Sequence, residues 1–141
     1  MNGITLTQAN SIIAAAIGAA RADGIPPLAV VVVDAAGHLI ALQREDGATM
    51  FRSDIALGKA WAAAAMGVAS GVLHQRAQGN PVFFNALAAS SHGKFIPQQG
   101  AVAIVGSDGA LLGAAGASGG TGAEDEAICA AGVRAAGLVT A

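Results

Sequence analysis

A run of small residues leads directly into three acids near the carboxyl end: Gly113-Ala114-Ala115-Gly116-Ala117-Ser118-Gly119-Gly120-Thr121-Gly122-Ala123-Glu124-Asp125-Glu126. Small side chains let another body, a ligand or a second subunit, approach the main chain closely. Acidic residues favour the first turn of a helix, where the helix dipole is positive. The stretch therefore predicts a closely approached strand, a loop over 118–122 and a last helix over 123–136.

Two hairpins are predicted from the apolar runs and the turns between them. Ser107-Asp108-Gly109 separates the runs 101–105 and 111–116, and Asp-Gly between apolar runs is a strong hairpin signal. The run 28–33 is β-branched and too short for a helix of its own. A turn over 34–37 and a returning strand over 38–44 complete the first hairpin.

Helical spacing of apolar residues predicts a helix through 12–20, with Thr7 as its N-cap and its end near Asp23 and Gly24. A second helix is expected over 51–69, with Ser53 or Asp54 near its start. Its many alanines would allow a sheet or a neighbouring helix to pack closely.

Pro81 fits the first turn of a short helix that runs to Ala89. The predicted order is helix, hairpin, two helices, hairpin and helix. This order indicates one α+β domain over 1–141, with helices packed on an antiparallel sheet built from the two hairpins.

The composition is strongly apolar, with 54% hydrophobic and only 11% charged residues, where typical soluble domains have about 25% charged residues. So few charges predict an apolar surface that is covered in a homo-oligomer. The alternative is that alanine and glycine, both tolerated at surfaces, make the composition look more apolar than the surface is. A net charge of −2 and seven scattered Lys and Arg residues argue against a nucleic-acid partner.

The strongly apolar runs 28–33 and 60–65 are far shorter than the roughly 20 residues of a membrane span. No basic residue precedes the apolar stretch 12–20, so an amphipathic helix explains it better than a signal peptide. The single cysteine, Cys129, excludes an internal disulfide and is expected to be a small buried hydrophobe. The expected compartment is the cytoplasm.

An ordered set of segments resembles the GlcG/HbpS family, which is related to the C-terminal domain of PduO-type corrinoid adenosyltransferases. The segments are Val30-Val31-Val32-Val33-Asp34-Ala35-Ala36-Gly37-His38-Leu39 followed by Arg44, Ile55-Ala56-Leu57-Gly58-Lys59-Ala60, and Ser118-Gly119 followed by Glu124-Asp125-Glu126. The resemblance covers nearly the whole chain. Before the second hairpin the chain departs from the family, because Gln98-Gln99-Gly100-Ala101-Val102 stands where members usually carry Gly-Gly-Val-Pro.

The resemblance implies a profilin-like or PAS-like fold and assembly into tetramers or octamers. Some members of the family bind haem, some sense redox state beside a sensor kinase, and many are encoded in catabolic operons. Haem is therefore the first candidate cofactor that the resemblance implies for this chain.

Haem requires an axial donor and an apolar slot, and three histidines could supply the donor. His38 follows a turn, which leaves a structural role and a ligand role both open. His74 is expected near a helix end, where it would neutralise the dipole. His92 lies in a loop beside small residues and is the best placed. No pair of histidines has metal-ligand spacing, so no metal site is expected.

Arg44 at a strand end and Lys59 in an alanine-rich helix are the second group of candidates. A buried Lys59 would require a carboxylate, which any residue of 124–126 could supply within one subunit or across an interface. One interpretation is a buried salt bridge that fixes the fold or the assembly. The other is an anion clamp for a propionate or a substrate carboxylate, with Asp125 as a general acid/base.

Two further groups of polar residues are given structural or accessory roles. Ser118 lacks the surroundings of a nucleophile, so its loop is expected to cap a helix or bind an anion. Asp46, Arg52 and Asp54 are expected to be solvated charges.

The first functional hypothesis is a small oligomeric binding protein that holds haem or a related tetrapyrrole in an apolar cleft. Its ligand-binding residues would be Arg44, His38, His92, Ser118, Gly119 and Gly120. The alternative is a catabolic enzyme or accessory protein acting on a small carboxylate. Arg44 and Lys59 would then anchor the anion, and Lys59, Asp125 and Glu126 would be catalytic. A third reading is an assembly module whose apparent site is an interface salt bridge.

Overall fold

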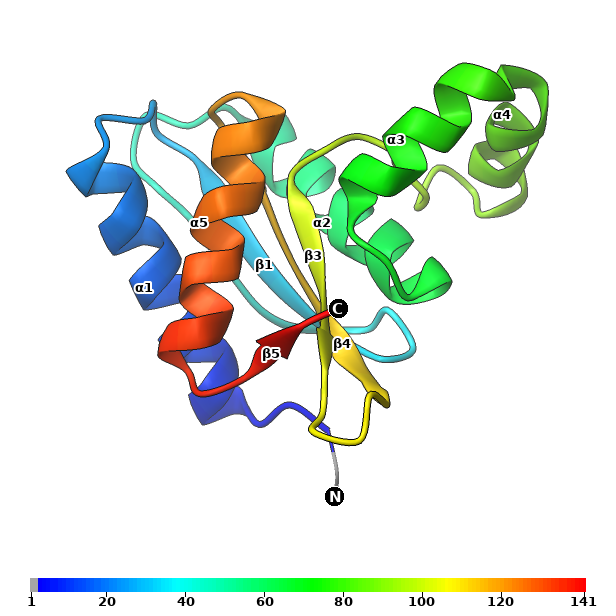
Figure 1. Ribbon diagram of the computed structural model, residues 1–141. Coiled ribbons are helices and arrows are strands. Elements are labelled where there is room, and N and C mark those ends of the chain that lie inside the picture. Colours follow the sequence, from blue (N-terminus) through cyan, green and yellow to red (C-terminus); the bar gives the residue numbers. More distant parts are fainter. Residues whose placement is uncertain (1–2) are drawn as a thin grey trace.

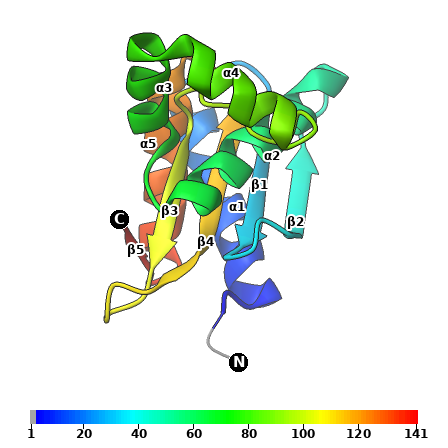
Figure 2. The same ribbon diagram turned by 90° about the vertical axis from the view of Figure 1, so that its right-hand side faces the viewer.

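The computed structural model describes residues 3–141 and has three layers (Figure 1). Helices α1 (Leu6–Ala22) and α5 (Gly122–Ala135) cover one face of a five-stranded sheet, and α2 (Met50–Met66) covers the other. Helices α3 (Ser70–Gly79) and α4 (Pro81–Ser90) follow α2, and α4 lies farthest from the sheet (Figure 2). The α+β class is confirmed.

The sheet is antiparallel and has the strand order β2-β1-β4-β3-β5. The two predicted hairpins are strands β1 (Ala29–Asp34) with β2 (Leu39–Arg44) and β3 (Ala101–Val105) with β4 (Leu111–Ser118). They join along β1 and β4 at the centre. The short strand β5 (Val139–Thr140) was not predicted, because two residues carry no periodic pattern.

Strand β1 is buried on both faces, which is why its sequence is continuously apolar. Successive side chains of a strand point to opposite faces. Val30 and Val32 pack under α1 and α5, whereas Val31 and Val33 pack under α2.

The small residues of β4 are approached by the chain itself. A Cβ added at Gly116 would lie 2.6 Å from the carbonyl oxygen of Ala56 and 3.0 Å from the amide nitrogen of Ala60, both in α2. A Cβ at Gly113 would meet the carbonyl of Val33 in β1. The prediction that a ligand or second subunit fills this stretch is therefore wrong for these two glycines, because α2 and β1 occupy the space.

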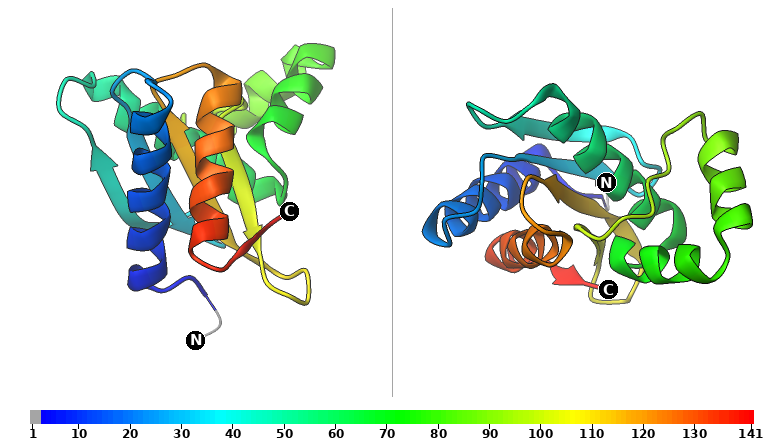
Figure 3. Two further views of the ribbon diagram at one scale, coloured as in Figure 1. Left: turned by 60° about the vertical axis from the view of Figure 1, so that its left-hand side comes forward. Right: turned by 90° about the horizontal axis from the view of Figure 1, so that it is seen from above.

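Helices α1 and α5 lie side by side (Figure 3). Gly132 of α5 allows this contact, because an added Cβ would lie 2.5 Å from the carbonyl oxygen of Ile12 in α1. By contrast, a Cβ at Gly18 in α1 would meet no atom of residues 3–141 within 4 Å.

The N-cap of α1 is Thr5 and not Thr7. Thr5 Oγ1 accepts a hydrogen bond from the backbone N–H of Gln8 at 3.1 Å, and Gln8 Oε1 accepts one from the N–H of Thr5 at 2.9 Å. This reciprocal pair is a capping box. Helix α2 likewise begins earlier than expected, after the N-cap Thr49 and ahead of Ser53 and Asp54.

A separate helix, α3, follows α2, whereas the sequence predicted only one helix between the first hairpin and Pro81. Gly67 ends α2 in the left-handed conformation, at φ 69°, and α3 then runs at 83° to α2. The sequence predicted His74 near a helix end, but it lies in the middle of α3. Helix α4 begins with Pro81, as predicted.

Among residues 3–141, no single helix has the length and hydropathy needed to cross a membrane, and only α2 and α3 taken together pass that test, as a bent pair.

Candidate functional site

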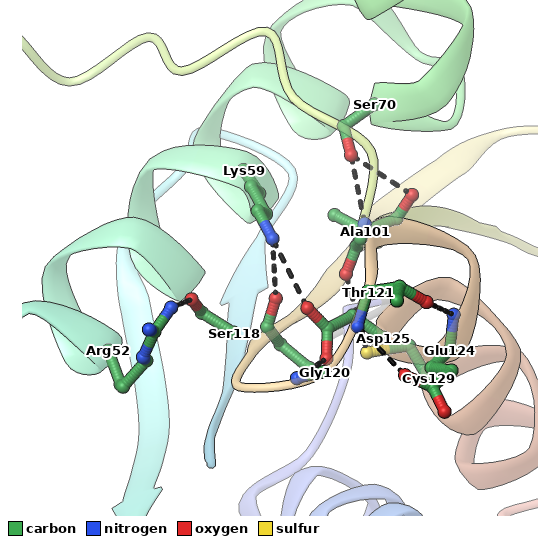
Figure 4. A network of polar contacts seen from close by, with 12 residues as sticks. Arg52, Lys59, Ser70, Ala101, Ser118, Gly120, Thr121, Glu124, Asp125 and Cys129 are labelled. Carbon is green, nitrogen blue, oxygen red and sulfur yellow. Dashed lines mark hydrogen bonds and ion pairs between the residues drawn. The ribbon is translucent and has the colours of Figure 1, made fainter. Parts of the chain in front are cut away.

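Lys59 and Asp125 form an ion pair where α2, the end of β4 and the start of α5 meet (Figure 4). Lys59 Nζ lies 3.4 Å from Asp125 Oδ2 and donates a hydrogen bond of 3.1 Å to the carbonyl of Ala117. The side chains are 7% and 1% exposed. The carboxylate partner that a buried Lys59 requires is thus Asp125 of the same chain.

A capping box at the start of α5 aims Asp125 inward. Thr121 is the N-cap, its hydroxyl accepts from the N–H of Glu124, and Glu124 in turn accepts from the N–H of Thr121. This holds Glu124 on the exposed side of the first turn. Asp125, the next residue, faces the interior, where the N–H of Gly120 donates to Oδ1 at 3.0 Å. Both carboxylate oxygens of Asp125 are engaged.

Glu126 lies apart from this pair. It is half-buried, and its Oε1 would be 3.1 Å from a Cβ added to Gly71 in the first turn of α3. The structure therefore gives the three acids of 124–126 three separate environments: a cap, an ion pair and a contact with α3.

A cavity of about 350 Å³ opens beside the ion pair and is named here the polar cavity. It is lined by Arg52, Ile55, Lys59, His74, Gln98, Gln99, Ser118, Gly120, Gly122 and Asp125. Arg52 Nη1 donates to Ser118 Oγ at 3.2 Å (Figure 4). The prediction of Arg52 as a solvated charge is wrong, since it is half-buried.

Arg44 and Gly119 do not line this cavity. Arg44 pairs with Ala29, which pairs in turn with Ser118, so all three share the sheet face under α2. Arg44 is exposed on the edge strand, however, and Arg52 takes the place beside Lys59 that the sequence assigned to Arg44. Gly119 packs against Leu28, where an added Cβ would clash.

A second cavity, named here the histidine cavity, has a volume of about 410 Å³. It is lined by Gly37, His38, Leu39, Asp54, Leu57, Gly58, Trp61, His92, Gly93 and Lys94. The structure thus brings His38, from the β1–β2 turn, together with His92, from the loop after α4. His92 has a positive φ of 56°. Nδ1 of His38 lies 3.8 Å from Asp34 Oδ2.

Two observations limit the metal and thiol chemistry of these regions. Within residues 3–141, no group of three His, Cys, Asp or Glu side chains is placed to hold a metal ion. Cys129 is fully buried, as predicted, and burial raises the pKa of its thiol far above the ordinary range. The thiol is therefore protonated at neutral pH and packs as an apolar group.

Several solved structures resemble this fold, whereas no curated protein matches the chain by sequence. A PduOC–haem complex has 28% identity over 98% of both chains and a TM-score of 0.86. The Klebsiella pneumoniae protein ORFY, of family DUF336, has 25% identity over 95% of this chain and 90% of its own, with a TM-score of 0.86. HbpS has 27% identity over 95% of this chain and 90% of its own, with a TM-score of 0.82.

A family model described as haem-degrading protein HbpS-like matches residues 4–134. This match covers almost the whole chain, from the buried Ile4 before α1 to the last turn of α5. The chain therefore belongs to the HbpS-like family.

Proposed function

We propose that this protein binds haem or a related tetrapyrrole in the histidine cavity. The observation that carries the proposal is the presence of two imidazoles, His38 and His92, in one largely apolar cavity. Imidazole is a common axial ligand of haem iron, and about 410 Å³ falls within the range of small-molecule pockets. The similarity to a PduOC–haem complex supports the same conclusion.

The residues around the two imidazoles fit a tetrapyrrole. Leu57 and Trp61 supply apolar walls for the macrocycle, and the ammonium of Lys94 suits a propionate. Asp34 lies on the Nδ1 side of His38, which leaves Nε2 as the nitrogen available to iron. Haem bound in this cavity would supply a redox-active iron.

Titration with haemin, followed by the Soret band, tests this proposal. The wild type should give a saturable shift, and the variant His38→Ala/His92→Ala should lose it. His74→Ala is the matched control, because His74 lines the polar cavity instead. A wild type without a saturable shift, or a double variant that titrates like the wild type, would refute histidine-ligated haem in this cavity.

We also propose that the protein assembles into a homo-oligomer. Several large apolar side chains are exposed, among them Met50 at 69%, Phe51 at 62% and Val82 at 81%. Helix α4, which carries Val82, has no charged residue. Light scattering at two protein concentrations is expected to give a mass several times the 13.6 kDa of one chain. A mass of one chain at both concentrations would contradict assembly.

The alternative function, catalysis on a small carboxylate, depends on the polar cavity. Lys59 and Asp125 are present there, but Asp125 is almost fully buried and both its oxygens accept hydrogen bonds. A carboxylate held in this way is poorly placed to exchange a proton with a ligand. The geometry therefore favours binding over proton transfer in the polar cavity.

A further inference from the structure

The polar cavity differs from the histidine cavity in its charge. Three charged residues line it: Arg52 and Lys59 are cations and Asp125 is an anion. Asp125 is matched by Lys59. Among residues 3–141, no carboxylate lies within ion-pair distance of Arg52, and the only hydrogen bond of its side chain is to Ser118. One positive charge is thus left without a counterpart on the walls.

Unused hydrogen-bond donors line the same space. Ser118 is 1% exposed, and its hydroxyl accepts from Arg52, but within the described chain it donates to no acceptor. Lys59 uses two of its three N–H donors, on Ala117 and Asp125. Each of these buried side-chain atoms already has one partner within the described chain, and a ligand oxygen would engage the donors that are left over.

The first turn of α5 adds to the positive potential. Gly122, the first residue of the helix, lines the cavity, and its N–H has no acceptor within the helix. The dipole of α5 also places partial positive charge at this end. Donors from α2, β4 and α5 therefore converge on one cavity of about 350 Å³.

We propose that the polar cavity is a second binding site, which takes a small carboxylate. Its carboxylate group would accept hydrogen bonds from Arg52 and Ser118, with the ammonium of Lys59 close by. A planar, singly charged carboxylate matches a guanidinium and one uncompensated positive charge. The inference goes beyond haem binding, because it concerns a different cavity and other residues.

The test uses acetate as the probe and the ¹⁵N-labelled full chain. The backbone amide resonances of Gly120 and Gly122 are followed by NMR at constant ionic strength. Acetate should shift both resonances saturably, and acetamide, its neutral counterpart of the same shape, should not. Equal shifts with acetate and acetamide, tighter binding of inorganic phosphate than of acetate, or no saturable shift would overturn the proposal.

Two arginine variants test whether acetate binds at Arg52. Arg52→Gln should weaken acetate binding about tenfold or more, the effect of losing a hydrogen bond to a charged group. Arg44→Gln is the matched control, because Arg44 lies on the same sheet face but outside the cavity, and it should bind acetate like the wild type. Unchanged affinity in Arg52→Gln would overturn the proposal.

Two more variants keep the result interpretable. Ser118→Ala removes only the buried hydroxyl and should also weaken acetate binding, so it replaces Arg52→Gln if that variant does not fold. The variant His38→Ala/His92→Ala should bind acetate normally, which separates this site from the haem proposal. Loss of acetate binding in that variant would overturn the assignment to the polar cavity.

Discussion

Replacing Lys59 by methionine isolates the electrostatic contribution of the ion pair, because methionine keeps most of the apolar stem of the side chain. At 3.4 Å and an effective dielectric constant of about 20, two unit charges attract by about 5 kcal/mol. Desolvation offsets part of this attraction, and removing one partner of a buried pair typically costs about 3–5 kcal/mol. Asp125 keeps its hydrogen bond from Gly120, so the expected loss is about 3 kcal/mol.

Urea denaturation measures this loss through the fluorescence of Trp61, the single tryptophan. Protein concentration is held constant, since assembly would otherwise shift the apparent stability. Arg44→Met is the control, because Arg44 is exposed and forms no ion pair within residues 3–141; it should change stability by at most about 0.5 kcal/mol.

A second variant tests whether the loss of stability comes from the unpaired charge that Lys59→Met leaves on Asp125. Lys59→Met/Asp125→Leu removes both charges, leaves no buried charge uncompensated, and should recover much of the stability lost in Lys59→Met. A loss below about 1 kcal/mol in the single variant, as for an exposed pair, would refute the account. So would a double variant that is less stable than the single one.

The remaining predictions concern the contact between α1 and α5 and the buried thiol. Gly132→Ala should lower the free energy of unfolding by about 1–3 kcal/mol, because its Cβ would lie 2.5 Å from a backbone oxygen of α1. Gly18→Ala, in open space in α1, should instead raise it by up to about 1 kcal/mol; equal effects in urea denaturation would contradict the contact. Stability should fall above about pH 9, by up to about 1.4 kcal/mol per pH unit, because the unfolded chain loses the Cys129 proton while burial raises the pKa of the folded thiol. Unfolding at several alkaline pH values checks this, and Cys129→Ala should lose that part of the slope; an unchanged slope would contradict it.

The hairpins were predictable because their signals are local. Asp108-Gly109 and the turn 34–37 each stand between apolar runs, and turn chemistry acts over a few residues. Helix α3 was missed because its sequence contains Gly71 and Gly79 and few apolar residues at helical spacing. Its apolar contact is made mainly by Leu73, which packs with Phe84 of the next helix, α4, and with Phe95 in the segment that follows α4.

Part of the site could also be predicted from the sequence. Lys59 was correctly expected to find a carboxylate among 124–126, because a charge in an alanine-rich helix requires a partner. The choice of Asp125 could have been made from Thr121 and Glu124, whose spacing is that of a capping box and assigns Glu124 to the helix end. The same signal, Thr5 with Gln8, would have corrected the N-cap of α1.

The cavities themselves could not be read from local patterns. His38 and His92 are 54 positions apart in the numbering and meet only because the loop after α4 returns over α2. Arg52 resembles a solvated charge in the sequence, and only the position of Ser118 at the end of β4 gives it a partner. Such placements depend on the packing of α2 against the sheet.

Gly116 also determines how deeply Lys59 is set into the molecule. The two nearest atoms that an added Cβ would meet are backbone atoms of Ala56 and Ala60, and the third is the Cβ of Ala60, so no rotamer change could make room for it. A larger residue at this position would displace α2 as a rigid unit and carry Lys59, the neighbour of Ala60, away from Asp125. A larger side chain at Gly116 would thus weaken an ion pair that it does not touch. Substitutions at Gly116, Lys59 and Asp125 should therefore occur together in divergent homologues.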